Sequence, residues 1–181
     1  MKDGLPPRRA CEKVPQRFVP RLVTSRHLCL FQANTWTPIA PMRTTRLHFA
    51  LVAVSNKLYA FGGKGQSSIE AYDPMTNEWA EVGEMPEARW GMSFVTYAGA
   101  VYIVGGWTPT DACSNDVLRY APARGEWRRL RPLLPAGDDG RTICATAAVH
   151  RQNLYVVGGW NKEGNAANAV RCYNLETVSS S

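Results

Sequence analysis

Short apolar runs that stop at a glycine pair recur along the chain. They read KLYAF at 57–61, VYIV at 101–104 and LYVV at 154–157, and each is rich in aromatic and β-branched residues. Such residues fit a pleated, half-buried strand, and the glycines end it. We therefore predict a β-strand at each of these three places.

A second type of apolar run precedes two of these strands. FALVAV at 49–54 and ICATAAV at 143–149 are nearly continuous and contain several small residues, which predicts strands buried on both faces near a crowded axis. Further on, YDPMTNEW at 72–79 places Asp-Pro and Thr-Asn turn residues between two strands. Each unit is thus predicted to hold four short antiparallel strands.

Fixed marks repeat with this pattern. An arginine is followed 16 or 17 residues later by the glycine pair, then by a tyrosine, and in the first two units by a tryptophan seven residues after the tyrosine. Trp36 lies ten residues before the first arginine, as Trp79 lies ten before the second. A period of 43 to 53 residues with four strands per unit is typical of a propeller blade. The marks are Arg46, Gly62, Gly63, Tyr72 and Trp79; Arg89, Gly105, Gly106, Tyr120 and Trp127; and Arg141, Gly158, Gly159 and Tyr173.

This pattern resembles the kelch repeat, in which a diglycine after the second strand is followed by a tyrosine and a tryptophan at fixed spacing. The resemblance extends from about Trp36 to Tyr173; YDPMTNEW matches closely, whereas Tyr120-Ala-Pro and Tyr173-Asn-Leu are looser. It implies an all-β fold, namely a partial (open) kelch-type β-propeller. We expect about three four-stranded antiparallel blades plus a stray outer strand around Trp36.

The blades are expected at about 46–85, 89–133 and 141–178, in a kelch-repeat region at 36–178 after a basic, proline-containing, disordered leader at 1–35. In the third blade the tryptophan position falls on Ser180, beside the end of the sequence. Closed propellers need about four to eight blades, so we expect an open arc whose unprotected edges favour self-association. In kelch-like receptors a separate BTB domain of about 100 residues or more engages the cullin, and we expect none in this chain.

Composition narrows the range of partners. The net charge of +6 lies in the leader, where residues 1–35 hold seven Lys or Arg against two acidic residues, while residues 42–181 are near neutral with 14 basic and 13 acidic side chains. We therefore expect no nucleic-acid partner. No run approaches the roughly 18 apolar residues of a membrane span. Five scattered cysteines without a C-x-x-C motif predict reduced thiols in the cytoplasm or the nucleus.

The glycine pairs and the histidines offer no catalytic site. GGKGQSS at 62–68 departs from dinucleotide-binding spacing at Ser68, and no βαβ unit surrounds it. The glycines, and the repeated tyrosines and tryptophans, are therefore predicted to be structural. His27, His48 and His150 lack a partner at metal-ligand spacing. We predict no enzyme and no cofactor; a copper- or iron-dependent enzyme on the same fold is the alternative.

Loop lengths indicate which face recognises a partner. Chain direction reverses at every strand, so the loops from strand two to three and from strand four to the next strand one emerge on one face. There are 8 residues between Gly63 and Tyr72 but 13 in the later units, and the tryptophan-to-arginine interval grows from 10 to 14. Length variation on one face of a rigid scaffold is typical of a recognition surface.

Tryptophan and arginine at these loops have the composition of binding anchors. The resemblance implies that the arginines pair with an acidic peptide segment of a client protein; alternatively, they hydrogen-bond loop carbonyls and the tryptophans cover blade edges. It also implies a protein-interaction module like the client-binding part of cullin-linked ubiquitin-ligase substrate receptors, with actin binding as the alternative. The predicted face comprises Arg46, His48, Lys64, Gln66, Ser67, Arg89, Trp90, Trp107, Thr108, Asp111, Asn115, Arg141, Trp160, Asn161, Lys162 and Glu163.

Overall fold

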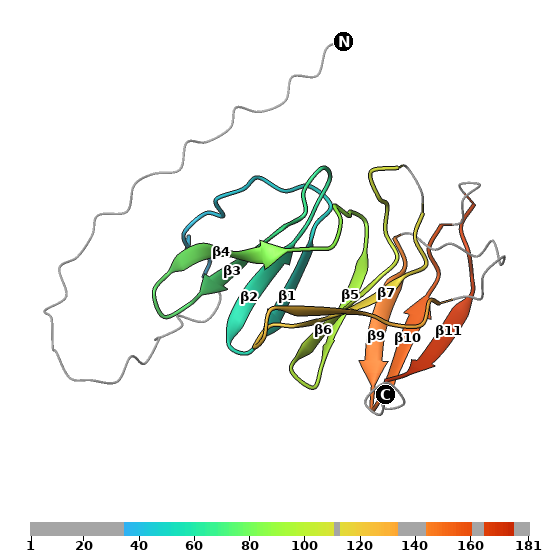
Figure 1. The fold of residues 1–181 in the computed structure, drawn as a ribbon. Helices are drawn as coiled ribbons and strands as arrows, with labels where there is room; N and C mark the ends of the chain where they lie inside the picture. The colour runs from blue at the N-terminus through green and yellow to red at the C-terminus, as the bar shows by residue number, and fades with distance from the viewer. Residues whose placement is uncertain (1–34, 111–112, 134–143, 161–164, 176–181) are drawn as a thin grey trace, which may run out of the picture. The chain divides into compact units, whose positions relative to one another are not determined.

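A computed structural model describes residues 35–110, 113–133, 144–160 and 165–175 (Figure 1). The chain divides into two units, Met1–Thr37 and Pro38–Ser181. All strands of the described residues lie in the second unit, and no helix occurs among them.

Three antiparallel sheets make up this second unit, and in each the strands pair in chain order. Sheet 1 contains β1 (Ala50–Val54), β2 (Lys57–Phe61), β3 (Ser68–Asp73) and β4 (Glu78–Glu84). Sheet 2 contains β5 (Ser93–Tyr97), β6 (Ala100–Val104), β7 (Val117–Ala121) and β8 (Glu126–Arg129). Sheet 3 contains β9 (Thr146–His150), β10 (Asn153–Val157) and β11 (Val170–Asn174).

The predicted all-β, open arrangement of four-stranded units is confirmed for the described residues, except that sheet 3 has three strands there. The described strands form sheets of four, four and three strands that do not close into a ring, and β1, β5 and β9 follow one another from sheet to sheet (Figure 1). The strands predicted from KLYAF, VYIV and LYVV are β2, β6 and β10. The fourth strand expected near Ser180 lies outside the described residues.

The three sheets repeat one register, which gives each sheet two comparable faces. Directly opposite one another stand Ala50, Phe61 and Ile69 in sheet 1, Ser93, Val104 and Val117 in sheet 2, and Thr146, Val157 and Val170 in sheet 3. Paired residues share a face and neighbours along a strand alternate. We call the face that carries these residues the following face, because in sheets 1 and 2 it packs on the next sheet. We call the opposite face of each sheet the preceding face.

Two hydrophobic clusters lie between successive sheets. Between sheets 1 and 2, Phe61 and Ile69 pack with Val101, Ile103 and their neighbours. A second cluster joins the following face of sheet 2 to the preceding face of sheet 3, with Leu154 and Val156 at its centre. The preceding face of sheet 1 has no neighbouring sheet among the described residues and is covered instead by the segment 40–49, with Ala40, Met42 and Phe49 packed on it.

Two expectations about the strands were wrong. β1 and β9 are not buried on both faces: burial alternates along them, and Leu51 is 43% exposed. Each lies in a sheet with a neighbouring sheet on one side only, so half of its side chains stay uncovered. The stray outer strand around Trp36 is not formed, since residues 35–49 contain no strand. Pro38 and Pro41 lack the N–H that a strand ladder requires.

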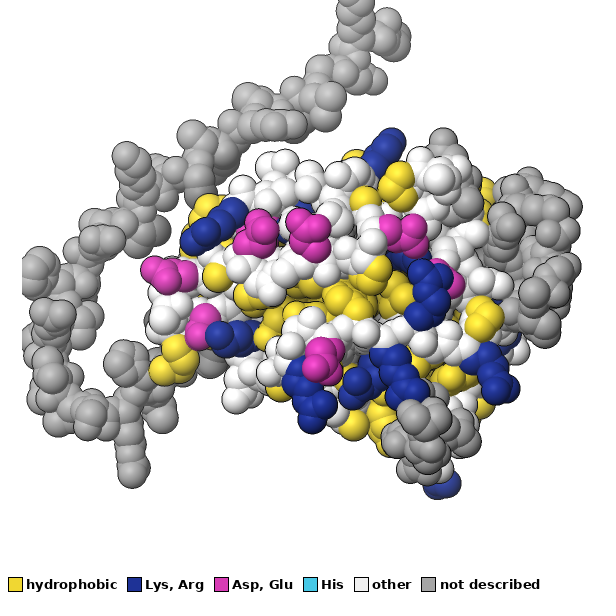
Figure 2. Space-filling model, in the orientation of Figure 1, with side chains coloured by type: hydrophobic (Ala, Val, Ile, Leu, Met, Phe, Trp, Pro, Cys, Tyr) yellow, Lys and Arg dark blue, Asp and Glu magenta, His cyan; other side chains and the backbone are white. Residues whose placement is uncertain are grey.

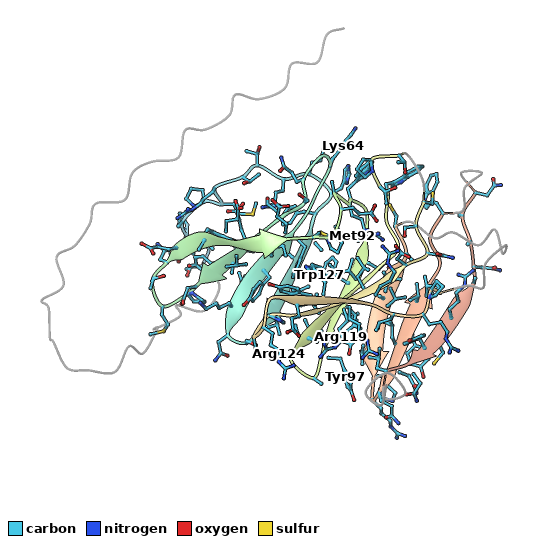
Figure 3. All side chains as sticks on the ribbon, in the orientation of Figure 1. Lys64, Met92, Tyr97, Arg119, Arg124 and Trp127 are labelled. Atoms are coloured by element: carbon cyan, nitrogen blue, oxygen red, sulfur yellow. The ribbon has the colours of Figure 1, made fainter. Side chains whose placement is uncertain are left out.

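The outer strand of sheet 2 is basic. Arg119 and Arg128 are cross-strand partners on β7 and β8, and Arg124 and Arg129 have side chains that are 75% and 59% exposed. Figure 2 shows Lys and Arg side chains gathered in the lower half of the view, where Figure 3 labels Arg119 and Arg124. Charged side chains on an outer strand disfavour pairing with a strand of another molecule.

Candidate protein-interaction face

The repeated arginines point into the sheets. The Nη1 of Arg46 donates to the carbonyl of Gly62 at 2.8 Å and to that of Ser68 at 2.8 Å. In the next unit the Nη1 of Arg89 donates to the carbonyl of Gly105 at 2.9 Å. Both side chains are completely buried. Each arginine therefore ties the start of a strand-two-to-three loop to the start of its own unit.

A buried carboxylate completes the first of these contacts. Glu70 accepts hydrogen bonds from the Nη2 of Arg46 at 2.8 Å and from the backbone N–H groups of Arg43 and Thr44 at 2.8 and 3.1 Å. Burial by itself would raise the pKa of Glu70, but these charge-assisted bonds outweigh burial and hold the pKa below its usual value. The carboxylate is thus ionised and anchors the segment 43–46 to β3.

Asp116 has the corresponding role in sheet 2. It accepts hydrogen bonds from the Nη2 of Arg89 at 3.1 Å and the Nη1 of Arg129 at 2.6 Å, and Glu87 also pairs with Arg89. Burial again opposes ionisation, but the bond from Arg89 and the charges of both arginines lower the pKa of Asp116. An ion-pair network, rather than a lone pair, fixes the end of the β6–β7 loop.

These contacts remove Arg46 and Arg89 from the residues that a partner could touch. Their guanidinium groups bind loop carbonyls, which is the alternative role considered for them from the sequence, while Arg141 lies outside the described residues. Sequence reasoning missed Glu70 and Asp116. A single acid inside the apolar stretch SIEAY was the available signal for Glu70, because buried carboxylates are rare unless they are paired.

The glycine pairs allow close approach of backbones, from Gly62 to the start of the next unit and from Gly106 to the start of its own unit. Gly62 has a φ of 59°, and a Cβ there would lie 2.8 Å from the carbonyl oxygen of Arg89. Gly106 has a φ of 95°, and a Cβ there would lie 2.9 Å from the carbonyl oxygen of Trp90. Both distances are shorter than side-chain contacts allow. Gly62 therefore lets its unit pack on the next one, and Gly106 lets its loop pack on the start of its own unit.

The repeated tyrosines and tryptophans form cross-strand pairs. Tyr72 stands opposite Trp79 with ring centroids 5.3 Å apart, and Tyr120 stands opposite Trp127 at 4.8 Å. The Nε1 of Trp127 also donates to the carbonyl of Glu84 in sheet 1 at 2.9 Å. Each pair therefore secures the outer strand of its sheet, and Trp127 also reaches the preceding unit.

Backbone hydrogen bonds bring the two variable classes of loop to one end of the sheets. Lys64 donates its N–H to the carbonyl of Leu47 at 2.9 Å, and Trp107 and Trp90 exchange N–H to carbonyl bonds at 2.8 and 3.2 Å. The N–H of Met85 bonds the carbonyl of Ser67 at 2.8 Å. Figure 3 shows Lys64 at this end, away from the turns that carry Tyr97 and Arg124.

We call the exposed surface at this end the loop face. Leu47 is 60% exposed and Trp160 is 53% exposed, and Lys64 and His48 are also exposed. Trp90 and Trp107 are half-buried, as are Gln66, Ser67 and Asn115, whereas Thr108 is buried. The loop face consists of His48, Leu47, Lys64, Gln66, Ser67, Trp90, Trp107, Asn115 and Trp160.

Sequence reasoning missed Leu47 on this face. In the first two units, the residue after the arginine hydrogen-bonds the residue after the glycine pair, so Leu47 and Lys64 correspond to Trp90 and Trp107. The repeat spacing was the signal that could have identified it. The remaining predicted members, Asp111, Arg141, Asn161, Lys162 and Glu163, lie outside the described residues.

Within the described ranges, no three His, Cys, Asp or Glu side chains lie close enough together to hold a metal ion. In the same part of the chain, no helix has the length and apolar character needed to cross a membrane. The described cysteines, Cys113, Cys144 and Cys172, form no disulfide.

The sequence profile of the KLHDC2/KLHL20/DRC7 Kelch-repeats domain matches residues 23–180. The chain belongs to the kelch-repeat family. It is 34% identical over 136 residues to alpha-scruin of Limulus polyphemus and 30% identical over 145 residues to Kelch-like protein 35 of Mus musculus. It is also 27% identical over 151 residues to Kelch-like protein 40 of Xenopus laevis.

These alignments cover 70%, 76% and 80% of this chain. They cover 14%, 24% and 24% of the three relatives, so the chain spans less than a quarter of the length of these kelch-repeat proteins. The resemblance inferred from the arginine, glycine, tyrosine and tryptophan marks is confirmed, and each kelch unit corresponds to one sheet.

Proposed function

We propose that this kelch-repeat chain is a non-enzymatic module that recognises a segment of another protein with its loop face. The observation that carries the proposal is the contrast between the two kinds of repeated residue. The arginines are buried and hold the loops in place, whereas large apolar side chains and a cation at the loop ends remain exposed. A rigid scaffold that displays aromatic anchors is typical of a protein-binding site.

The chemistry of the loop face suggests the kind of segment that it binds. Trp160 and Leu47 offer apolar area, and Lys64 offers a positive charge beside Leu47. An acidic group followed by an apolar side chain would satisfy both. We infer that the client contributes an acidic, partly apolar peptide segment, and that Arg46 and Arg89 act indirectly by positioning Lys64 and Trp107.

On the basis of the kelch-like relatives, we propose that the chain is the client-binding part of a cullin-linked ubiquitin-ligase receptor in the cytoplasm or the nucleus. The similarity to a scruin keeps actin binding as the second candidate. Co-sedimentation of the chain with actin filaments, compared with binding to soluble peptide libraries, separates the two roles. If the chain pellets with the filaments and added peptides do not reduce the pelleted fraction, actin binding is favoured.

A peptide array probed with the full chain tests the loop face. The Lys64→Ala/Trp160→Ala double variant should lose binding to the acidic peptides that wild type captures, by at least tenfold. Met75→Ala is the matched control, because Met75 is 80% exposed in the turn between β3 and β4, at the other end of sheet 1. Equal binding by wild type and the double variant would remove the loop face from consideration.

A further inference from the structure

The described residues leave the following face of sheet 3 uncovered, although its counterparts in sheets 1 and 2 are buried. Phe61 in sheet 1 and Val104 in sheet 2 are 0% and 3% exposed, whereas Val157 at the same register position is 45% exposed. Ile69 and Val117 are both 0% exposed, whereas Val170 is 64% exposed. Sheet 3 thus has apolar residues at positions that the described residues of this chain leave exposed.

In sheets 1 and 2, the surface that covers a following face is the preceding face of the next sheet. The chain carries one such face without a partner sheet among its described residues, on sheet 1. There Tyr72 and Trp79 repeat Tyr120 and Trp127, and Trp79 donates to the carbonyl of Ala40 at 2.9 Å, as Trp127 donates to that of Glu84. The preceding face of sheet 1 is therefore built like the preceding face of sheet 2, which covers the following face of sheet 1.

An apolar residue on this face is left over for an outside contact. Leu51 is 43% exposed, while Phe94 at the matching position of sheet 2 packs into the cluster between sheets 1 and 2. Met42 on the covering segment is only half-buried, whereas Met85 at the matching place is 3% exposed. Leu51 and Met42 are thus more exposed than Phe94 and Met85, as expected if no following face of another sheet covers the preceding face of sheet 1.

Charge does not oppose contact between these two faces. The following face of sheet 3 presents Thr146, Ala148, Tyr155, Val157, Val170 and Cys172, with His150, Asn153 and Asn174 at one end, and it carries no Lys, Arg, Asp or Glu. On the preceding face of sheet 1 the buried Glu70 is already paired with Arg46, and its cross-strand partner Glu81 is exposed on β4. Because β4 is the outermost strand of sheet 1, contact over the inner strands would bury mainly apolar surface and leave Glu81 in solvent.

We propose that two copies of this chain dock head to tail, the preceding face of sheet 1 in one copy covering the following face of sheet 3 in the other. Two copies bring six sheets together, a number within the range of about four to eight that closes a propeller. A two-fold arrangement makes the same junction twice and leaves neither face open. The proposal does not rest on the loop face, which lies at the ends of the strands.

Two single variants test this pairing through the molar mass of the full chain in light scattering. Val170→Asp changes the face of sheet 3, and Leu51→Asp changes the face of sheet 1; both positions are exposed, so far-UV circular dichroism should be unchanged. Wild type is expected at twice the monomer mass and each variant at the monomer mass. Met75→Asp, an exposed apolar site outside both faces, should keep the double mass.

Mixing the two variants distinguishes head-to-tail pairing from pairing of identical faces. An equimolar mixture of Val170→Asp and Leu51→Asp chains contains one intact face of each kind, so one junction forms and the double mass returns. If sheet 3 paired with sheet 3, Leu51→Asp alone would remain dimeric and the mixture would not recover the pairing lost by Val170→Asp. That result, or a wild type that is monomeric at all concentrations, would overturn the proposal.

Discussion

The side chain of Arg46 makes two kinds of contact. It neutralises Glu70 and at the same time binds the carbonyls that begin the β2–β3 loop. Arg89 makes the matching bond to Gly105 but pairs with Asp116, the residue just before β7, whereas Glu70 lies within β3. The arginine and the glycine carbonyl are thus the repeated part, and the position of the acid varies between units.

The Glu70 carboxylate should make stability depend on pH. Its pKa in the folded chain lies below the usual 4.5, so its contribution is complete above about 4.5 and is lost as pH falls through the lower folded value. Glu70→Gln should cost on the order of 3 kcal/mol at pH 7, because a buried charge loses its partner. Urea denaturation at pH 7 and at pH 3 should show that the difference from wild type shrinks in acid; a constant difference would contradict this role.

A side chain at Gly106 should be destabilising for two separable reasons, the positive φ and the lack of space for a Cβ. Gly106→Ala combines a positive φ with a Cβ 2.9 Å from a carbonyl oxygen, whereas Gly125 has a φ of 67° and nothing within 4 Å. Gly125→Ala should therefore cost only the backbone term of about 1–2 kcal/mol. Gly106→Ala should cost about 1–3 kcal/mol more, through overpacking. Equal thermal unfolding shifts in the two variants would show that close approach does not matter.

At the scale of the strand, cross-strand aromatic pairs secure the outer edge of each sheet. Trp127 on β8 contacts Tyr120 on the neighbouring strand, and its ring lies 6.1 Å from that of Phe61 across the junction between sheets 1 and 2. One side chain thus holds β8 to its own sheet and the sheet to its neighbour. Arg128 and Arg129 on the same strand are exposed, and Arg129 also pairs with Asp116.

Trp127→Ala should weaken both attachments at once. We expect a loss of about 3 kcal/mol in the free energy of unfolding, the lower end of the range for a large aromatic side chain because Trp127 is only partly buried. Trp160→Ala, at a side chain that is 53% exposed, should change stability by less than about 0.5 kcal/mol. Denaturant titrations of both variants provide the comparison, and equal losses would refute the bridging role of Trp127.

The strands could be predicted from sequence because their signals are local. Apolar runs that end in glycine marked β2, β6 and β10, and the repeat then supplied the order of strands. The direction of a long side chain is not local: nothing in the letters around Arg46 shows that a carboxylate 24 residues later draws it into the sheet. For the same reason, Leu51 was predicted to be buried, although its cover depends on a neighbouring sheet.

At the scale of the whole molecule, the described residues cover sheet 2 on both sides and sheet 3 on one side. The central strand β6 is buried along its entire length, whereas β9 and β11 are exposed at every second residue. Cooperative opening begins where few apolar contacts must be broken. Stability should therefore decrease from sheet 2 to sheet 3.

Amide hydrogen exchange in Val170→Asp should display this gradient, because this variant keeps sheet 3 uncovered. Amides of β6 should exchange slowest, at rates set by global unfolding, while those of β9 and β11 exchange at least tenfold faster through local opening. In wild type the amides of sheet 3 should slow toward those of β6 as a second copy covers Val157. Sheet 3 amides that are as slow as β6 in the variant would mean that the described strands open as one unit and that the uncovered face does not weaken sheet 3.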